Sequence, residues 1–401
     1  MRISKKTTIA HMINLDVVGG VERIYCQLIN ADIRHVEHHT VSCRNAIAKI
    51  LQQDVSTGSK STHFAKKFYA VKIPKWPCFM RKKWLKNIFL DISPDIVIVW
   101  NKPEGFDLSL LPEGTKVLYY EHGAAWNNHS RKKVRHFLNR VSGIICNSLA
   151  SQKLLEFKYQ PGPKVNYHIC LNAIRPDCLP PSFKAKKFPA GRAFNLGVAA
   201  RLLPFKGICL AVHAVKILKT RNIHCCLFIA GIGPEKKNLQ SLVGRLGLEN
   251  EITFCNLVED MSQFYEKIDC FLCPSIREPF GLVVAEAMAH GCPAVVAAVD
   301  GLPEVVTHNM NGFCIDPDLP IEQYSQLGGT DAQWPEYVYD AKAGKVVRPK
   351  FVDPIRLADN IQALCSQPEL YESMSQAAIQ CVREQFDFKN YINNFYTALQ
   401  D

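Results

Sequence analysis

Short apolar runs rich in β-branched residues recur along this chain, and helix-length segments separate them. The pattern is typical of parallel α/β layers, because a buried parallel strand needs a crossover helix to reach the next strand. It occurs twice, with about six strands in each half, and predicts an α/β protein of two doubly wound, Rossmann-like domains. The expected strands are residues 8–13, 39–43, 96–100, 117–120, 143–147 and 165–170, then 195–199, 225–230, 252–255, 270–273, 294–297 and 312–315.

Residues 176–192, which hold four prolines and three lysines, are interpreted as a linker between an N-terminal domain (1–175) and a C-terminal domain (193–384). Helical runs at 356–366 and 369–384 close the second domain. A last helix within 385–401 is expected to pack back on the N-terminal domain. Residues 317–350 carry several prolines and a glycine pair, which predicts a long irregular excursion.

The composition is that of a soluble globular protein, with 47% hydrophobic and 21% charged residues among 401. The chain contains no run of 18 apolar residues, and its first residues are too polar for a secretory signal. Its sixteen cysteines lie mostly singly in apolar runs, which favours a reducing cytoplasm. Cys270 and Cys273 have zinc-ligand spacing but no second pair, so a metal or redox role is disfavoured.

Charge is distributed unevenly between the two halves. Residues 1–170 hold 26 Lys and Arg against 12 Asp and Glu, a net charge of +14, whereas residues 171–401 hold 22 against 25, a net charge of −3. In the densest basic stretch, residues 60–86, lysines alternate with aromatic residues, and Met80, Trp84 and Ile88 would share one helical face. This profile indicates a helix in an anionic membrane surface or contact with an acidic acceptor. The alternatives are a solvated basic face over a core-facing stripe and, without any supporting motif, nucleic acid.

Two glycine pairs occupy expected strand-to-helix turns. Gly19 and Gly20 follow the first strand, where glycine lets a ligand approach the backbone and a helix N-terminus offers N–H groups to an anion. Many such turns need glycine for geometry alone. Gly231 and Gly233 lack the third glycine of a dinucleotide-binding fingerprint, so that function is disfavoured.

Arg201 and Lys206 lie on the loop after the first strand of the second half. In an open α/β sheet the ligand crevice lies at this edge, beyond the carboxyl ends of the strands. A planar guanidinium and an ammonium can converge there on a diphosphate, although a solvated loop is the simpler alternative.

Glu278 and Glu286 lie eight positions apart across a Pro-Phe-Gly turn and a helix start. A carboxylate can accept two hydroxyls, as a vicinal sugar diol requires. The N–H groups of Phe280, Gly281 and Leu282 open the helix and would face phosphate or sugar oxygens. Helix capping could explain Glu278, but Glu286 lies in an apolar helix, where a charge needs a partner.

With these motifs in this order, the chain resembles the retaining family 4 glycosyltransferases of the GT-B fold (glycosyl transferases group 1), of the bacterial cell-surface glycan type. The resemblance implies two Rossmann-like domains facing each other across a cleft. It covers nearly the whole chain and rests on Gly19-Gly20, His122-Gly123, Asn147-Ser148, Asn172-Ala173-Ile174, Arg201 with Lys206-Gly207, Gly231 with Gly233-Pro234, Pro274-Ser275, Glu278 with Glu286, and Gly301-Leu302-Pro303-Glu304.

The resemblance implies a role for each matched residue in the donor site. Arg201 and Lys206 would hold the donor diphosphate, Glu286 the ribose hydroxyls and Glu278 the transferred sugar. Phe280, Gly281 and Leu282 would offer their N–H groups to the same donor.

Gly19 and Gly20 would let a first-domain loop approach the diphosphate, and His122 would contact the donor sugar near the reaction centre. A buried or helix-capping histidine is the alternative for His122, and His290 is expected to cap a helix C-terminus. The expected reaction is a front-face displacement in which the leaving diphosphate takes the acceptor's proton. With two cations at the diphosphate, no metal or other cofactor is expected, and Asp316-Pro317-Asp318 is interpreted as a turn.

The resemblance also implies a nucleotide-diphosphate sugar, preferably UDP-linked, as donor and a membrane-associated glycan or glycolipid as acceptor, such as lipopolysaccharide core, O-antigen or a capsule precursor. The basic N-terminal domain would then contact the inner face of the cytoplasmic membrane, with no nucleic-acid partner. Two departures, Ala173 and the segment Cys255-Asn256-Leu257, stand where glycine is usual. A nucleotide-sugar epimerase of the same architecture and a non-catalytic sugar-nucleotide or membrane-binding protein remain the alternatives.

Overall fold

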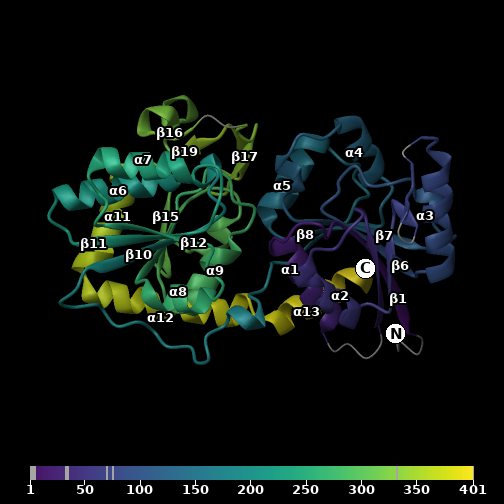
Figure 1. Cartoon of the computed structure of the whole chain (residues 1–401), viewed down its shortest axis with the longest axis horizontal. Coiled ribbons are helices and arrows are strands. Elements are labelled where there is room, and N and C mark those ends of the chain that lie inside the picture. Colours follow the sequence, from purple (N-terminus) through teal and green to yellow (C-terminus); the bar gives the residue numbers. More distant parts are fainter. Residues whose placement is uncertain (1–5, 32–35, 69–70, 75, 331–332, 401) are drawn as a thin grey trace. The chain divides into compact units, whose positions relative to one another are not determined.

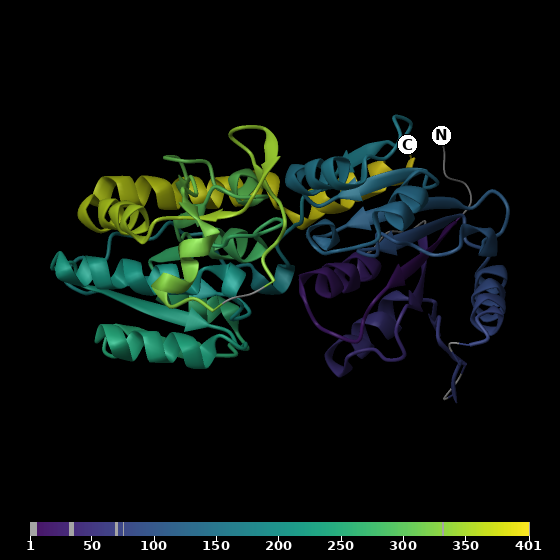
Figure 2. The same ribbon diagram turned by 90° about the horizontal axis from the view of Figure 1, so that it is seen from above.

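The computed structural model describes residues 6–31, 36–68, 71–74, 76–330 and 333–400 (Figure 1). The chain forms two compact units, the first made of residues 1–147, 155–171 and 391–401 and the second of residues 148–154 and 172–390. Each unit is built on one parallel sheet with helices on both faces (Figures 1 and 2). The predicted α/β class with two doubly wound domains is confirmed.

The sheet of the first unit has the strand order β3-β2-β1-β6-β7-β8-β9. After β3 the chain returns to the other side of β1, so the strand order reverses between β1 and β6. Ligands of doubly wound sheets bind at such a point. The strands are β1 (Thr7–Ile13), β2 (Val36–Ser42), β3 (Ser61–Phe64), β6 (Ile96–Trp100), β7 (Lys116–Glu121), β8 (Gly143–Cys146) and β9 (Tyr167–Ile169), and the helices named below are α1 (Gly20–Asn30), α2 (Gln52–Gly58), α3 (Phe79–Ile92), α4 (Arg131–Leu138), α5 (Leu149–Tyr159) and α13 (Phe388–Gln400).

The sheet of the second unit has the order β12-β11-β10-β13-β14-β15, which reverses between β10 and β13. Helix α6 packs against α7 and α11, and α9 packs against α12, so a helical layer covers each side of the sheet. The strands are β10 (Phe194–Ala199), β11 (Cys225–Ala230), β12 (Ile252–Asn256), β13 (Cys270–Cys273), β14 (Ala294–Ala297) and β15 (Gly312–Ile315), and the helices are α6 (Ile208–Thr220), α7 (Lys236–Leu246), α8 (Met261–Lys267), α9 (Leu282–Ala289), α10 (Leu302–Val305), α11 (Pro354–Ser366) and α12 (Pro368–Gln385).

All twelve expected strands are present, with ends that differ by three residues or fewer. The edge strand β3 was not predicted, because Ser61–Phe64 is a half-exposed segment without an apolar run. In the part of the chain that the structure describes, no helix is both long enough and apolar enough to cross a bilayer.

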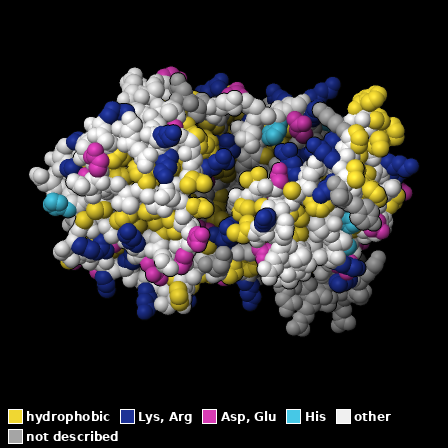
Figure 3. Space-filling model, in the orientation of Figure 1, with side chains coloured by type: hydrophobic (Ala, Val, Ile, Leu, Met, Phe, Trp, Pro, Cys, Tyr) yellow, Lys and Arg dark blue, Asp and Glu magenta, His cyan; other side chains and the backbone are white. Residues whose placement is uncertain are grey.

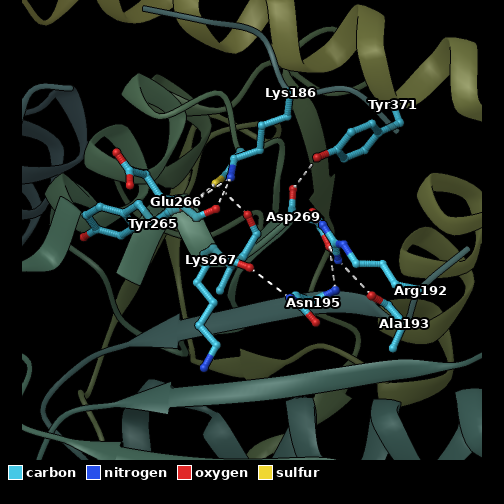
Figure 4. Close-up of polar contacts among 11 residues, drawn as sticks. Lys186, Arg192, Ala193, Asn195, Tyr265, Glu266, Lys267, Asp269 and Tyr371 are labelled. Atoms are coloured by element: carbon cyan, nitrogen blue, oxygen red, sulfur yellow. Dashed lines mark hydrogen bonds and ion pairs between the residues drawn. The ribbon is translucent and has the colours of Figure 1, made fainter. Parts of the chain in front are cut away.

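Residues 176–192, expected to be a linker, belong to the second unit and are anchored to it by polar contacts (Figure 4). Arg192 binds the carboxylate of Asp269 through two nitrogens, at 2.6 and 2.7 Å. Lys186 donates from Nζ to the carbonyl oxygens of Tyr265 and Glu266, at 3.1 and 2.8 Å. Arg192 and Lys186 therefore satisfy acceptors of the second unit, whereas the Lys187 side chain is 85% exposed and pairs with Glu372 at the surface.

The C-terminal helix α13 packs on the first unit from Tyr391 onwards. The hydroxyl of Tyr120 donates to that of Tyr391 at 3.5 Å, and the ring of Phe395 stacks on Trp100 and Tyr120. Near the end of the helix, Lys116 Nζ binds the carbonyl of Leu399 at 3.0 Å.

The excursion over residues 317–350 contains short antiparallel pairs, as far as it is described. β16 (Leu319–Pro320) pairs with β19 (Lys350–Phe351), and β17 (Val338–Asp340) pairs with β18 (Lys345–Val347). The second pair matters for the site described below, because Tyr339 exchanges hydrogen bonds with Asp300.

Candidate functional site

Lys206 and Glu278 meet at the carboxyl edge of the second sheet. Lys206 lies on the loop after β10, and Glu278 lies on the loop after β13, the neighbouring strand. Their Nζ and Oε2 atoms are 2.6 Å apart, and both side chains are largely buried. Burial alone would lower the pKa of Lys206, but the Glu278 carboxylate outweighs this effect and raises it, so Lys206 carries its positive charge.

Glycine determines how closely these two loops approach. Gly207 has φ +65°, and a Cβ atom there would lie 2.0 Å from the carbonyl oxygen of Pro274. Any other residue at this position would push the loop that carries Lys206 away from the loop that carries Glu278.

The glycines of the loop after β11 likewise allow close contact between two loops. A Cβ atom on Gly231 would lie 1.9 Å from the Ala200 carbonyl oxygen, and one on Gly233 would lie 2.4 Å from that of Leu202. These contacts explain the Gly-x-Gly pattern without a bound dinucleotide. They also shape the loop that carries Arg201, whose exposed side chain has no hydrogen bond or ion pair within the described residues.

The loop of Glu278 is held by Asp300, which the sequence did not single out. Asp300 is fully buried and has φ +52°. Its carboxylate accepts the N–H of Glu278 at 3.0 Å and the N–H of Tyr339 at 2.8 Å. The sequence signal for it is an aspartate directly before Gly301, in the loop that follows the buried strand β14.

Further hydrogen bonds join the start of α5 to the loops near Glu278. Ser148 Oγ, directly before this helix, donates to the Pro279 carbonyl at 2.7 Å. Glu304 accepts the N–H groups of Leu149 and Ala150, at 2.8 and 3.1 Å. Burial raises the pKa of Glu304, although these two donors oppose the shift.

Helix α9 begins at Leu282, next to this loop. Its N-cap is Gly281, with φ +101°, and Phe280 packs edge-to-face on Phe386. The first N–H groups of a helix have no partner within it, so they stand ready for an acceptor.

Glu286 lies one turn further along α9 and is 4% exposed. Its carboxylate accepts the hydroxyl of Tyr265 at 2.9 Å and lies 3.5 Å from Arg175 Nη2. The partner that its charge needs in an apolar helix is thus Arg175. The structure joins Glu286 to these two residues, and its contact with ribose stays a prediction.

In the first unit, His122 follows β7 and is 8% exposed. Its ring stacks on Trp100 with a centroid distance of 5.4 Å, and neither ring nitrogen has a hydrogen-bond partner among the described residues. Burial lowers the pKa of His122 to about 3, so the ring is neutral at physiological pH. Two unsatisfied nitrogens in a buried ring do not fit a satisfied core histidine; they suit a ligand that hydrogen-bonds.

The turn after His122 is ordered by two residues that sequence reasoning missed. Glu121 is fully buried and accepts the N–H groups of Gly123 and Ala125, at 2.6 and 3.0 Å. Asn101 Oδ1 accepts those of His122 and Ala124, at 3.2 and 2.9 Å.

Gly19 and Gly20 form the predicted turn between β1 and α1. Space is open around Gly20, since an added Cβ would meet nothing within 4 Å. Glu22 lies in the first turn of α1, beside Gly19. Burial raises the pKa of Glu22, although backbone N–H groups of this turn oppose the shift. An arriving anion would therefore meet a carboxylate at this helix N-terminus.

The other polar candidates have structural partners. Asp316 pairs with Lys342 at 2.7 Å, and Asp318 pairs with Arg356 at 3.2 Å. His290 follows α9 as its C-cap residue and contacts the Cys178 carbonyl at 3.1 Å. Cys270 and Cys273 are free thiols, and no group of three or more metal-ligating side chains occurs among the described residues.

Comparisons with known proteins agree with this architecture. Residues 182–327 match the family model for glycosyl transferases group 1. An uncharacterized glycosyltransferase of Methanocaldococcus jannaschii is 38% identical over 123 residues, which cover 30% of this chain and 31% of that relative. The lipopolysaccharide core biosynthesis glycosyltransferase LpsD of Rhizobium meliloti is 22% identical over 306 residues, which cover 76% of this chain and 82% of the relative.

Among solved structures, Anabaena HepE in complex with UDP and glucose aligns with a TM-score of 0.71 at 18% identity, over 98% of this chain and 99% of that one. This likeness shows that the chain has the GT-B fold of two Rossmann-like domains. The family match lies on the second unit, and Arg201, Lys206, Glu278 and Glu286 all fall within the matched range. Over residues 182–327, the chain carries a domain of the glycosyl transferases group 1 family.

Proposed function

We propose that the protein is a retaining glycosyltransferase that moves a sugar from a nucleotide-diphosphate sugar, UDP-linked by preference, to a hydroxyl of a membrane-associated glycan or glycolipid. The observation that carries the proposal is the buried Lys206–Glu278 pair at the carboxyl edge of a sheet that belongs to a glycosyltransferase domain. The UDP and glucose held by HepE and the role of LpsD in lipopolysaccharide core biosynthesis support the donor and acceptor classes.

In the proposed reaction, the bond between the anomeric carbon and the donor phosphate oxygen breaks while the acceptor oxygen bonds to the same face of that carbon. The acceptor's proton passes to the leaving diphosphate. Arg201 and Lys206 stabilise the charge that develops on the diphosphate, and Glu278 accepts sugar hydroxyls. We assign His122 to the donor sugar, Glu286 to the ribose, and Gly19 and Gly20 to the approach of the diphosphate.

The ion pair has a consequence for donor binding. In the present structure the charge of Lys206 is shared with Glu278, so a diphosphate competes with this carboxylate for the ammonium group. Two cations at the diphosphate supply the charge that a divalent metal would otherwise provide, and transfer is proposed to proceed without metal or other cofactor.

The test is calorimetric titration with UDP, GDP and ADP in the presence of a chelator. We expect one nucleotide to bind the wild type and to bind Lys206→Ala about tenfold or more weakly, because a charged hydrogen bond is lost. Glu278→Gln should keep or tighten this binding while transfer falls, because Lys206 no longer shares its charge. Lys237→Ala removes an exposed lysine from α7 and is the matched control.

A wild type that binds none of the three nucleotides would contradict the donor assignment. Where transfer is observed, the anomeric configuration of the product, measured by NMR, decides retention. Inversion of that configuration would overturn the proposed front-face displacement.

The membrane contact is assigned to the exposed apolar residues next to α3. Trp76, Phe79 and Val71 are 84%, 62% and 69% exposed, and the same stretch of sequence, residues 66–86, contains several lysines. Of the same stretch, Tyr69 and Lys75 lie outside the described residues. Exposed apolar side chains in a lysine-rich segment suit an anionic bilayer, and the inner face of the cytoplasmic membrane is the proposed location.

The face predicted for this contact requires correction. Met80, Trp84 and Ile88 share one side of α3, but Ile88 is 2% exposed and Trp84 donates from Nε1 to the Phe64 carbonyl at 2.9 Å. The stripe therefore packs inward over most of its length. The exposed apolar residues lie instead at the start of α3 and on the β4 (Lys67–Phe68) and β5 (Val71–Lys72) hairpin.

A further inference from the structure

Three basic residues follow the carboxyl ends of three strands in the first unit. Arg44 comes two residues after Ser42 of β2, and Lys66 comes two residues after Phe64 of β3. Ser42 is paired with Phe64 and with Ile13, so these positions are in register. Lys102 likewise comes two residues after Trp100 of β6, and β6 is paired with β1 at Met12 and Val99.

This register brings the three side chains to one end of the sheet, around the point where the strand order reverses. Neighbouring strands lie about 4.8 Å apart, so β3 and β6 are separated by roughly 14 Å across β2 and β1. Long side chains starting from these positions can converge on one group. The pairwise electrostatics agree, because Lys66 lies within the influence of Lys102, Arg44 and Arg81.

The cluster is crowded with like charges. Burial, followed by Lys102 and Arg44, lowers the pKa of Lys66. No carboxylate pairs with Lys66 or Lys102 among the described residues, and Arg44 has only Asp16, at 3.8 Å. Arg81 donates from Nε and Nη2 to the Ile73 carbonyl, so it contributes charge but is held in place.

A polar group beside this cluster also lacks a partner. Asn45 follows Arg44, and its Oδ1 atom is buried without a hydrogen bond to any described residue. The Arg44 side chain is 57% exposed, so the cluster is open to a ligand from solvent. In Figure 3, Lys and Arg side chains are visible over both units, and several of those on the first unit lie near one another.

We propose that Arg44, Lys66 and Lys102 form a binding site for a phosphate group of the acceptor, with Asn45 Oδ1 as an adjacent hydrogen-bond acceptor for a hydroxyl of the same molecule. The inference rests on the proposed function, because it names the chemical class of the acceptor: a phosphorylated glycan or glycolipid. A bound phosphate dianion relieves the repulsion among the three cations, two of which, Lys66 and Lys102, have no acidic partner among the described residues.

The test uses the Lys206→Ala protein, so that the donor-side cation is absent and the result does not depend on nucleotide binding. Inorganic phosphate is titrated at constant ionic strength, with chloride as the competing salt, and binding is measured by calorimetry. We compare this background with Lys66→Met/Lys102→Met and with Lys83→Met/Lys86→Met, which removes the same charge from exposed positions of α3.

We expect phosphate affinity to fall about tenfold or more in the first double variant and to stay unchanged in the second. The first double variant should also unfold at a higher temperature in chloride, because repulsion is removed. Equal losses in both variants, or no phosphate binding in the background protein, would overturn the site even if UDP binds the wild type normally.

A second arm distinguishes a lipid phosphate from a soluble one. Vesicles with phosphatidic acid carry a phosphomonoester, whereas those with phosphatidylglycerol carry a diester. Preferential binding to phosphatidic acid that inorganic phosphate displaces, and that Lys66→Met/Lys102→Met abolishes, assigns the site to a lipid-borne phosphate. Phosphate binding without that preference assigns it to a soluble phosphorylated glycan, and identical behaviour of both double variants on both vesicles contradicts the site.

Discussion

At the scale of single residues, the buried polar side chains of the candidate site differ in whether they have a protein partner. In the second unit, Glu278, Asp300 and Glu286 each have a protein partner. In the first unit, both nitrogens of His122 are buried and have none within the described parts of the chain. A buried polar atom without a hydrogen bond costs free energy in the empty protein, and that cost is recovered when a ligand supplies the bond.

His122 should make stability depend on pH. Its pKa is about 3 in the folded protein because of burial, against an ordinary value of 6.5. Between these values the unfolded chain binds a proton that the folded chain does not, so stability falls as the pH falls from 6.5 towards 3. His122→Asn should reduce the slope of unfolding free energy against pH by about 1.4 kcal/mol per pH unit.

Urea unfolding of both proteins at several pH values between 7 and 4 measures this difference. The buried His11 and His38 also have lowered pKa values and contribute to the slope in both proteins, so the comparison isolates His122. If unfolding free energy falls with pH equally in both proteins, the pKa of His122 is the same in the folded and unfolded states, and the prediction is wrong.

At the scale of elements, residues 176–192 illustrate how a segment whose regular structure is one short 3-10 helix, Pro176–Cys178, is held. The carboxylate of Asp269 is 4% exposed and accepts both Arg192 nitrogens and the N–H of Asn195, at 2.8 Å (Figure 4). One buried acid at the start of β13 thus joins the segment to β10. Removal of Arg192 leaves this acid with a single backbone donor among the described residues.

Arg192→Ala should therefore lower the free energy of unfolding by about 2 to 3 kcal/mol, as expected for lost hydrogen bonds to a charged group. It should also expose residues 176–192 to limited proteolysis. Arg348→Ala is the control, since its pair with Glu336 is exposed and 3.7 Å long, and should cost about 0.5 kcal/mol or less. Equal resistance to protease in wild type and Arg192→Ala would mean that other contacts hold the segment.

Sequence patterns predicted the strands because a buried parallel strand consists of a local run of apolar residues, such as Ile96–Trp100 and Cys270–Cys273. They could not predict what tertiary contacts decide. The hydrogen bond from Asp300 to Glu278 joins residues 22 positions apart, which no local pattern indicates. The prolines and lysines of residues 176–192 are equally compatible with a segment that packs on a domain and with one that lies in solvent. The spacing of Met80, Trp84 and Ile88 predicted a shared face correctly but not the side to which it turns.

At the scale of the whole molecule, the charge difference between the two parts of the sequence is the main feature. The net charge of +14 lies in residues 1–170, which supply most of the first unit, and the exposed Trp76 and Phe79 lie in the same part. Long-range attraction to anionic lipids brings such a protein to a membrane, and apolar side chains that enter the interface then hold it there. The two contributions respond differently to salt, because only the first is screened.

Binding to phosphatidylcholine vesicles with and without phosphatidylglycerol, measured by co-sedimentation, separates these contributions. The wild type should bind the anionic vesicles at low salt and lose most of this binding at high salt. Trp76→Ser/Phe79→Ser should bind about tenfold or more weakly at low salt, because burial of each aromatic side chain contributes about 1.5 to 3 kcal/mol.

Ile355→Ser/Leu257→Ser removes comparably exposed apolar residues from the second unit and should have no effect. Equal binding by all three proteins would contradict a membrane contact through α3, and binding independent of phosphatidylglycerol would contradict the role of the basic surface.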